Sequence, residues 1–250
     1  MNKLKNKVAV ITGGNSGIGF GIAEAFKNEN VVGTIVGRNK ETLASAAAQL
    51  GDDFIAINAD VTDLADLERV FKETAEKFGK IDVVVANAGA GTTGTVADTT
   101  EADFDNTVDL NLKSVYFTVQ KALPYMNDGG SVILIGSNAA HRAYPSFGLY
   151  GAAKAAVIYL AKAFSNDLIE RKIRVNVITP GTTDTPAFDK FVPAEQIEAL
   201  KTHFASVMPI GRIGHPSDIG KTAVFLASDD SSFMLGAELL VDGGMTYLSK

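Results

Sequence analysis

The feature that most constrains the fold is a regular alternation of short β-branched runs with longer helical stretches. The expected strands are Val8–Ile11, Val31–Val36, Phe54–Ile57, Ile81–Val85, Ser131–Ile135, Arg174–Ile178 and Glu238–Val241. The expected helices are Gly17–Lys27, Lys40–Leu50, Leu64–Phe78, Ala102–Met126, Gly151–Ile169 and Ser217–Leu226. The strands are apolar on both faces, as strands are when helices cover both sides of a sheet. The alternation therefore predicts an α/β fold with a doubly wound parallel sheet.

The domain organisation is predicted to be simple, because no Pro-, Gly- or Ser-rich linker divides the chain. We expect one domain over residues 1–250. The alternation of strands and helices is interrupted only between Pro180 and Pro209, where prolines and threonines surround one short helical stretch, Glu195–His203. An insertion of this length is typical of a binding loop, and we expect a substrate lid at about 182–208. A surface segment with no role in binding is the alternative.

Charge and composition exclude several classes of protein. The chain carries 23 Lys and Arg against 29 Asp and Glu, a formal charge of −6, which disfavours a nucleic-acid partner. It has no cysteine, hence no disulfide, thiolate metal site or cysteine nucleophile. No apolar run reaches the roughly 18–20 residues of a membrane span. The three histidines, His141, His203 and His215, lack ligand spacing, so no metal is expected. We expect a cytoplasmic protein without membrane contact.

A glycine-rich turn follows the first expected strand, with the sequence Thr12-Gly13-Gly14-Asn15-Ser16-Gly17-Ile18-Gly19. Glycines allow a tight turn and bring backbone amides close to a pyrophosphate at a helix N-terminus. The spacing is G-x-x-x-G-x-G rather than G-x-G-x-x-G. A tight turn that binds no ligand is the alternative at this point.

A series of motifs along essentially the whole chain resembles one family. The series is Thr12-Gly13-x-x-x-Gly17-x-Gly19, Asn87-Ala88-Gly89, Asn111, Ser137, Tyr150-x-x-x-Lys154, Pro180-Gly181 and Val241-Asp242-Gly243-Gly244. In this order the motifs resemble those of the short-chain dehydrogenase/reductases. The resemblance implies a Rossmann-type sheet of about seven strands in the order 3-2-1-4-5-6-7. It also implies a nicotinamide-dependent oxidoreductase and a homotetramer.

The end of the second strand indicates which nicotinamide cofactor is bound. NAD-binding sites usually place an acid there, which holds the ribose 2′-hydroxyl. Here Gly37 takes that place and Arg38, Asn39 and Lys40 follow. A guanidinium can pair with a 2′-phosphate, so Arg38 favours NADP(H) over NAD(H). The basic residue that many NADP-dependent relatives carry in the glycine loop is replaced by Ser16, and Arg38 as a solvated charge is the alternative.

The resemblance assigns the other cofactor contacts residue by residue. The cofactor-binding set is Gly13, Asn15, Ser16, Gly17, Ile18, Gly19, Arg38, Asn39, Asp60, Val61, Asn87, Ala88, Gly89, Tyr150, Lys154, Pro180, Gly181, Thr183 and Thr185. Within it, Asp60 would accept from the adenine amino group and Thr185 would bind the nicotinamide carboxamide. A turn former is the alternative for Asp60, and a tie between strands is the alternative for Asn87.

The catalytic residues implied by the resemblance are Asn111, Ser137, Tyr150 and Lys154. Tyr150 and Lys154 are four residues apart on one helix face. A nearby ammonium and an oxidised nicotinamide ring would lower the phenol pKa from about 10, making Tyr150 the general acid and base. Ser137 would donate to the substrate oxygen, and Asn111 would relay protons through a water beside the lysine.

The substrate is predicted to be a ketone, aldehyde or secondary alcohol of apolar character. The walls of the expected substrate pocket carry apolar and aromatic side chains: Tyr144, Phe147, Phe188, Phe191, Phe204 and Met208. A 3-oxoacyl-carrier-protein reductase shares every catalytic residue and is the alternative enzyme. It would need a basic patch, whereas the lid offers only Lys190 and Lys201 beside several acids. A non-catalytic NADP-binding sensor or scaffold is the alternative from another class.

Overall fold

Seven parallel strands form one sheet in the order β3-β2-β1-β4-β5-β6-β7, which confirms the predicted order. The computed structural model describes residues 3–190 and 192–249 of the chain. The strands are β1 (Val8–Thr12), β2 (Val32–Gly37), β3 (Phe54–Asn58), β4 (Ile81–Ala86), β5 (Met126–Ile135), β6 (Arg174–Pro180) and β7 (Glu238–Val241). Their carboxyl ends meet at one edge of the sheet, where open α/β folds bind ligands.

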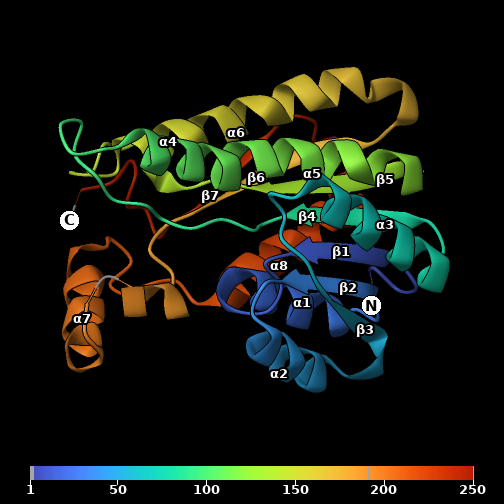
Figure 1. The fold of residues 1–250 in the computed structure, drawn as a ribbon, viewed down its shortest axis with the longest axis horizontal. Coiled ribbons are helices and arrows are strands. Elements are labelled where there is room, and N and C mark those ends of the chain that lie inside the picture. The colour runs from blue at the N-terminus through green and yellow to red at the C-terminus, as the bar shows by residue number, and fades with distance from the viewer. Residues whose placement is uncertain (1–2, 191, 250) are drawn as a thin grey trace.

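Helices cover both faces of the sheet (Figure 1). The helices are α1 (Gly17–Lys27), α2 (Lys40–Leu50), α3 (Leu64–Phe78), α4 (Glu101–Val108), α5 (Ser114–Ala122), α6 (Gly148–Asp167), α7 (Ile197–Val207) and α8 (Pro216–Ala227). One apolar core lies beneath α3, α5 and α6, and a second lies beneath α1, α2 and α8. Val84 belongs to the first core, whereas Val83 and Val85 belong to the second. Because side chains alternate along a strand, a strand between two cores must be apolar throughout.

The expected helix Ala102–Met126 is interrupted and ends early. A π-helical turn, Asp109–Lys113, separates α4 from α5, and α5 ends at Ala122. Pro124 follows in a short 3₁₀ turn, and because proline has no backbone N–H it cannot continue an α-helix. Met126 therefore pairs with Ile81 at the start of β5 instead of ending the helix. The helix expected from Gly151 begins earlier, at Gly148, so Tyr150 lies inside its first turn.

Segment 182–208 connects β6 to the region before α8 and contains two 3₁₀ turns and α7. The expected helical stretch is confirmed, with α7 at Ile197–Val207. In Figure 1, α7 stands apart from the sheet and its covering helices. Lys201 of α7 pairs with Asp184 at 2.9 Å, and the rings of Phe188 and Phe204 lie 6.1 Å apart. Phe191, one of the expected wall residues, lies outside the described residues.

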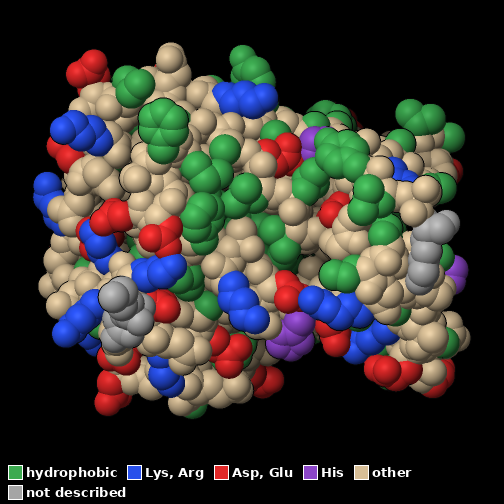
Figure 2. Space-filling view, turned by 180° about the vertical axis from the view of Figure 1, so that it is seen from behind, with side chains coloured by type: hydrophobic (Ala, Val, Ile, Leu, Met, Phe, Trp, Pro, Cys, Tyr) green, Lys and Arg blue, Asp and Glu red, His purple; other side chains and the backbone are tan. Residues whose placement is uncertain are grey.

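The surface carries charges of both signs. On the face seen in Figure 2, Lys and Arg side chains lie among Asp and Glu side chains, and apolar side chains gather near the middle. Within residues 3–190 and 192–249, no helix has the length and apolar character that crossing a bilayer requires.

Candidate active site

A cleft of about 530 Å³ opens at the carboxyl edge of the sheet and brings most of the predicted residues together. The predicted residues that line it are Gly13, Asn15, Ser16, Gly17, Ile18, Gly19, Arg38, Asn39, Val61, Asn87, Ala88, Gly89, Ser137, Tyr150, Lys154, Pro180, Gly181 and Thr185. Residues outside the predicted cofactor and catalytic sets also line it, among them Leu110, Pro186 and Ala187. Leu110 precedes Asn111, and Pro186 and Ala187 follow Thr185 inside the expected lid, which is the signal that would have found them.

The glycine loop forms one wall of this cleft, and its shape depends on the absence of side chains. Gly13 and Gly17 have φ of 64° and 54°, in the left-handed region that favours glycine. A Cβ added to Gly19 would lie 2.1 Å from the Gly13 carbonyl oxygen. Asn87 fixes the loop from β4, because its Nδ2 donates to the carbonyls of Thr12 and Gly13 at 2.9 and 3.2 Å. Asn87 therefore ties β4 to the loop, the alternative given for it above.

At the end of β2, the structure explains why no acid stands at position 37. A Cβ on Gly37 would lie 2.5 Å from Asn15 Oδ1. The Asn15 amide is held in place by its hydrogen bond to Thr42 Oγ1 at 2.8 Å. Asn15 thus fills the space that an acidic side chain would use. Asn39 caps α2, its Oδ1 accepting from the backbone N–H groups of Glu41 and Thr42 at 3.0 Å each.

Arg38 and Asp60 lie side by side at this end of the cleft. Arg38 Nη1 is 3.4 Å from Asp60 Oδ2, and the Arg38 side chain is 65% exposed. Asp60 Oδ1 accepts from the backbone N–H and hydroxyl of Thr62 at 2.9 and 2.8 Å. Burial raises the pKa of Asp60, but the Thr62 hydrogen bonds and the Arg38 charge outweigh it, so this pKa lies below its usual value. Asp60 thus shapes its own turn and orients Arg38.

Tyr150 and Lys154 lie one turn apart on α6. The ammonium nitrogen of Lys154 is 5.9 Å from the Tyr150 ring centroid and donates to the Ile135 carbonyl at 2.9 Å. Lys154 is only 2% exposed, and this burial lowers its pKa to about 8. Burial raises the pKa of Tyr150, and a hydrogen bond with Ser137 opposes that rise only in part. The net effect is a Tyr150 pKa above its ordinary value, opposite to the lowering expected beside Lys154 and an oxidised nicotinamide ring.

Ser137 follows the end of β5 and begins the 3₁₀ turn Asn138–Ala140. Its Oγ accepts from the backbone N–H of Ala139 at 3.2 Å, while the same hydroxyl is hydrogen-bonded to Tyr150. Both hydroxyls thus lie together at the wall of the cleft, where one substrate oxygen can contact both.

Asn111 lies in the π-helical turn and is fully buried. Its Nδ2 donates to the Thr107 carbonyl at 3.0 Å, and its Oδ1 accepts from the backbone N–H of Ala90 at 3.1 Å. A Cβ on Gly89 would lie 3.0 Å from Asn111 Oδ1 and 3.4 Å from Lys154 Nζ. Asn111 and Lys154 therefore both approach Gly89, which with Lys154 lines the cleft.

Three predicted residues do not line the cleft within the part of the chain that the structure describes: Asp60, Asn111 and Thr183. Thr183 is buried and its hydroxyl donates to the Gly181 carbonyl at 3.0 Å. Thr185, in contrast, reaches the glycine loop, since a Cβ on Gly17 would lie 3.1 Å from Thr185 Cβ. Among His, Asp and Glu of the described residues, no group of three could hold a metal ion.

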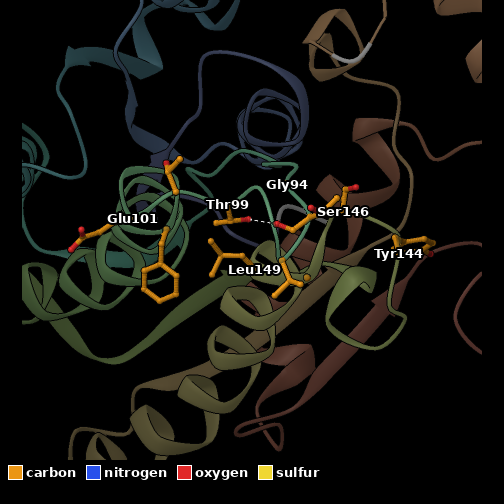
Figure 3. Close-up of a pocket in the computed structure, with 11 residues that line it drawn as sticks. Gly94, Thr99, Glu101, Tyr144, Ser146 and Leu149 are labelled. Atoms are coloured by element: carbon orange, nitrogen blue, oxygen red, sulfur yellow. Dashed lines mark hydrogen bonds between the residues drawn. The ribbon is translucent and has the colours of Figure 1, made fainter.

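A second cavity, of about 740 Å³, lies between the loop after β4 and the loop before α6. Figure 3 shows Glu101 on one side of it and Tyr144 on the other. The two loops are joined by a hydrogen bond from Gly94 N to Ser146 O at 2.8 Å. Tyr144 Oη accepts from Asn138 Nδ2 at 3.0 Å, so the wall of this cavity is linked to the residue after Ser137.

The sheet order, the glycine loop and the cleft at the carboxyl edge define a Rossmann-type dinucleotide-binding fold. Residues 13–246 match the family model described as enoyl-(acyl carrier protein) reductase. The chain belongs to the short-chain dehydrogenase/reductase family of oxidoreductases, which bind a nicotinamide cofactor and act on small molecules.

Similar proteins match over nearly their whole length. "Oxidoreductase asL5" of Sarocladium schorii is 39% identical over 99% of both chains. An "NADP-dependent (R)-specific alcohol dehydrogenase" of Lentilactobacillus kefiri is 36% identical over 98% of both chains. The structure of a short-chain dehydrogenase/reductase from Serratia marcescens superposes with a TM-score of 0.90 at 31% identity, covering 98% of this chain and 99% of that one.

Proposed function

We propose that the protein transfers a hydride between NADP(H) and a ketone, aldehyde or secondary alcohol. The observation that carries the proposal is that Ser137, Tyr150 and Lys154 line the same cleft as the glycine loop. The cleft fits a dinucleotide, because Gly19 has no side chain and the loop that is to hold the pyrophosphate can therefore fold tightly there. A side chain on Gly19 would clash with that loop. When bound, the nicotinamide supplies or accepts the hydride.

The protein's own residues handle the proton and the substrate oxygen. In carbonyl reduction, the hydroxyls of Ser137 and Tyr150 donate to the carbonyl oxygen, and the Tyr150 phenol passes its proton to that oxygen. In alcohol oxidation, Tyr150 takes the proton back. Lys154 stabilises the phenolate through its charge, and Asn111, which meets it at Gly89, is the proposed end of the proton path to solvent.

A preference for NADP(H) is supported by the end of β2. Arg38 is exposed at the rim of the cleft, and Asp60 holds its guanidinium. Asn15 excludes an acidic side chain at position 37, where one would repel a 2′-phosphate. The Lentilactobacillus kefiri relative is named as NADP-dependent, which agrees with this assignment.

The single domain of residues 1–250 and the lid at 182–208 are part of the same proposal. The lid stands over the cleft edge through Thr185, Pro186 and Ala187, which line the cleft. The rings of Phe188 and Phe204 pack against each other within the lid, 6.1 Å apart. The apolar side chains of the lid support an apolar carbonyl substrate.

A carrier-linked substrate is the second candidate, favoured by the description of the matching family model. A carrier protein is acidic and would need free basic side chains near the cleft. Lys201 of the lid is instead paired with Asp184 and Glu198. A free small-molecule substrate therefore has more support than a carrier-linked substrate.

We also propose a homotetramer. Apolar side chains are exposed on α5 and α6, at Tyr116 and Tyr159, and before β7, at Phe233 and Leu235. Helix faces and a loop beside an edge strand that expose such side chains are suited to contacts between copies. Sedimentation of the purified protein tests this assembly. The cytoplasmic location stays a prediction.

The test of function is initial-rate oxidation of NADPH and NADH against ketones that range from small aliphatic to bulky aryl-alkyl. Turnover with NADPH on bulky ketones is expected. Tight NADPH binding without turnover on any free ketone would instead favour the carrier-linked substrate, or the sensor or scaffold class. Acyl-carrier thioesters would separate these two.

A further inference from the structure

Glu238, at the start of β7, contacts two other segments through one oxygen atom. Thr179 Oγ1, at the end of β6, donates to Glu238 Oε1 at 2.6 Å. His141 Nε2 lies 2.6 Å from the same oxygen. The side chains of His141 and Glu238 are 24% and 21% exposed, so the pair is partly shielded from solvent. One carboxylate thus joins β6, β7 and the loop that follows Ser137.

The Thr179 arm of this cluster reaches the residue before Ser137. A Cβ on Gly136 would lie 2.7 Å from Thr179 Oγ1, so the threonine hydroxyl lies directly against Gly136. Gly136 N also donates to the Ile178 carbonyl at 2.8 Å. The backbone just before Ser137 is therefore held by β6, and the Thr179 hydroxyl links it to Glu238.

The His141 arm reaches the chain leaving Ser137. The backbone N–H of His141 donates to Asn138 O, and that of Ala140 donates to Ser137 O, both at 3.0 Å. The C-terminal segment adds further contacts: the Tyr247 ring lies 6.3 Å from the His141 ring, and Arg142 Nη1 donates to Met245 O at 3.2 Å. The turn after Ser137 is thus held from its far end.

We propose that Glu238 is a positioning residue, which acts through Thr179 and His141 to hold the loop 136–141 so that the Ser137 hydroxyl meets Tyr150. The proposal rests on the proposed function, because it concerns the same catalytic serine. It assigns a role to a residue that lies outside the cleft, on the last strand of the chain.

The test compares Glu238→Ala and His141→Ala with the parent enzyme and with Glu238→Gln, which keeps an oxygen acceptor. We expect kcat for ketone reduction to fall about tenfold in both alanine variants, because small displacements of a catalytic group have large effects on rate. Affinity for NADPH, measured by cofactor fluorescence, should stay unchanged. Glu238→Gln should recover part of the lost rate.

A second readout does not depend on turnover. Ser137 stabilises the Tyr150 phenolate by a hydrogen bond, so loss of its position should raise the pKa of Tyr150. Ultraviolet difference titration against a Tyr150→Phe reference in each background isolates that phenol; Lys154 is the charged group whose ammonium faces its ring. The titration should move to higher pH in both alanine variants and less in Glu238→Gln.

Glu170→Ala removes an exposed carboxylate elsewhere and serves as the control, expected to match the parent in both readouts. Parent-like kcat and phenol titration in both alanine variants would overturn the proposal. A loss of NADPH affinity equal to the loss of kcat would overturn it too, since that indicates general misfolding. If the parent itself reduces no carbonyl, the proposed function fails, yet the titration still decides the role of Glu238.

Discussion

The ammonium nitrogen of Lys154 lies 5.9 Å from the ring of Tyr150 on α6, where Lys154 is buried and Tyr150 is half-buried at the wall of the cleft. Burial disfavours the charged form of each group, so it raises the pKa of the phenol and lowers that of the amine to about 8. The two pKa values, 10.0 and 10.5 for the free groups, are thereby moved apart, and the amine becomes the more acidic of the two. At neutral pH the phenol keeps its proton, as a general acid must.

Removing the phenol hydroxyl tests the role of Tyr150. Tyr150→Phe should lower kcat for ketone reduction by about 10³-fold, the size of a general acid contribution. The affinity for NADPH should be preserved, because the ring and the glycine loop remain. Stopped-flow turnover and fluorescence titration measure the two quantities. Retained turnover would contradict the assignment.

The pH dependence of alcohol oxidation should reflect the phenolate. Oxidation requires Tyr150 as a base, so its kcat/KM should rise with pH towards the raised pKa of Tyr150. Reduction requires the neutral phenol and should fall over the same range. Lys154→Met removes the positive charge that favours the phenolate, so the oxidation profile should move to higher pH. An unmoved profile would show that Lys154 does not act on the phenol.

Substitutions at the end of β2 test the cofactor preference. Arg38→Asp should shift the ratio of kcat/KM values from NADPH towards NADH, because an acid repels the 2′-phosphate and accepts from the ribose hydroxyl. Gly37→Asp should instead weaken both cofactors, since its Cβ would lie 2.5 Å from Asn15 Oδ1. Steady-state kinetics with both cofactors separates these outcomes. An unchanged preference in Arg38→Asp would make Arg38 a plain surface charge.

The glycine loop offers a matched pair of substitutions. Gly19→Ala should lower NADPH affinity at least about 100-fold, because the methyl group would overlap the Gly13 carbonyl oxygen. Gly148→Ala adds the same group at a helix start where no atom lies within 4 Å, so NADPH affinity should not change. Isothermal titration of both variants measures the difference. Equal affinities would mean that the cofactor does not lie along this loop.

Local patterns were sufficient to predict the sheet and the placement of Tyr150 and Lys154. Strand periodicity and apolar character gave every strand of β3-β2-β1-β4-β5-β6-β7, and the family resemblance gave their order. The spacing of four predicted that Tyr150 and Lys154 share one helix face, and both lie on α6, which begins three residues before the expected start at Gly151. These features depend on residues close together along the chain.

Features that depend on distant residues were not predicted. Asn111 was assigned to a regular helix, whereas it lies in a π-helical turn and bonds Ala90 of another loop. The sequence also did not predict that Asp60 contacts both Thr62 and Arg38, because either partner alone would satisfy a carboxylate. His141 was considered only as a histidine without ligand spacing, yet it contacts Glu238, 97 residues away.

The contact between His141 and Glu238 has a consequence for biosynthesis. Every strand that frames the glycine loop and Ser137 is translated before β7, so a nascent chain can form most of the cofactor cleft before Glu238 has left the ribosome. The turn after Ser137 gains its contact with Glu238 only when the last strand joins the sheet. If the proposed role of Glu238 holds, a chain arrested before β7 would form the cleft while the loop 136–141 still lacked its contact with Glu238.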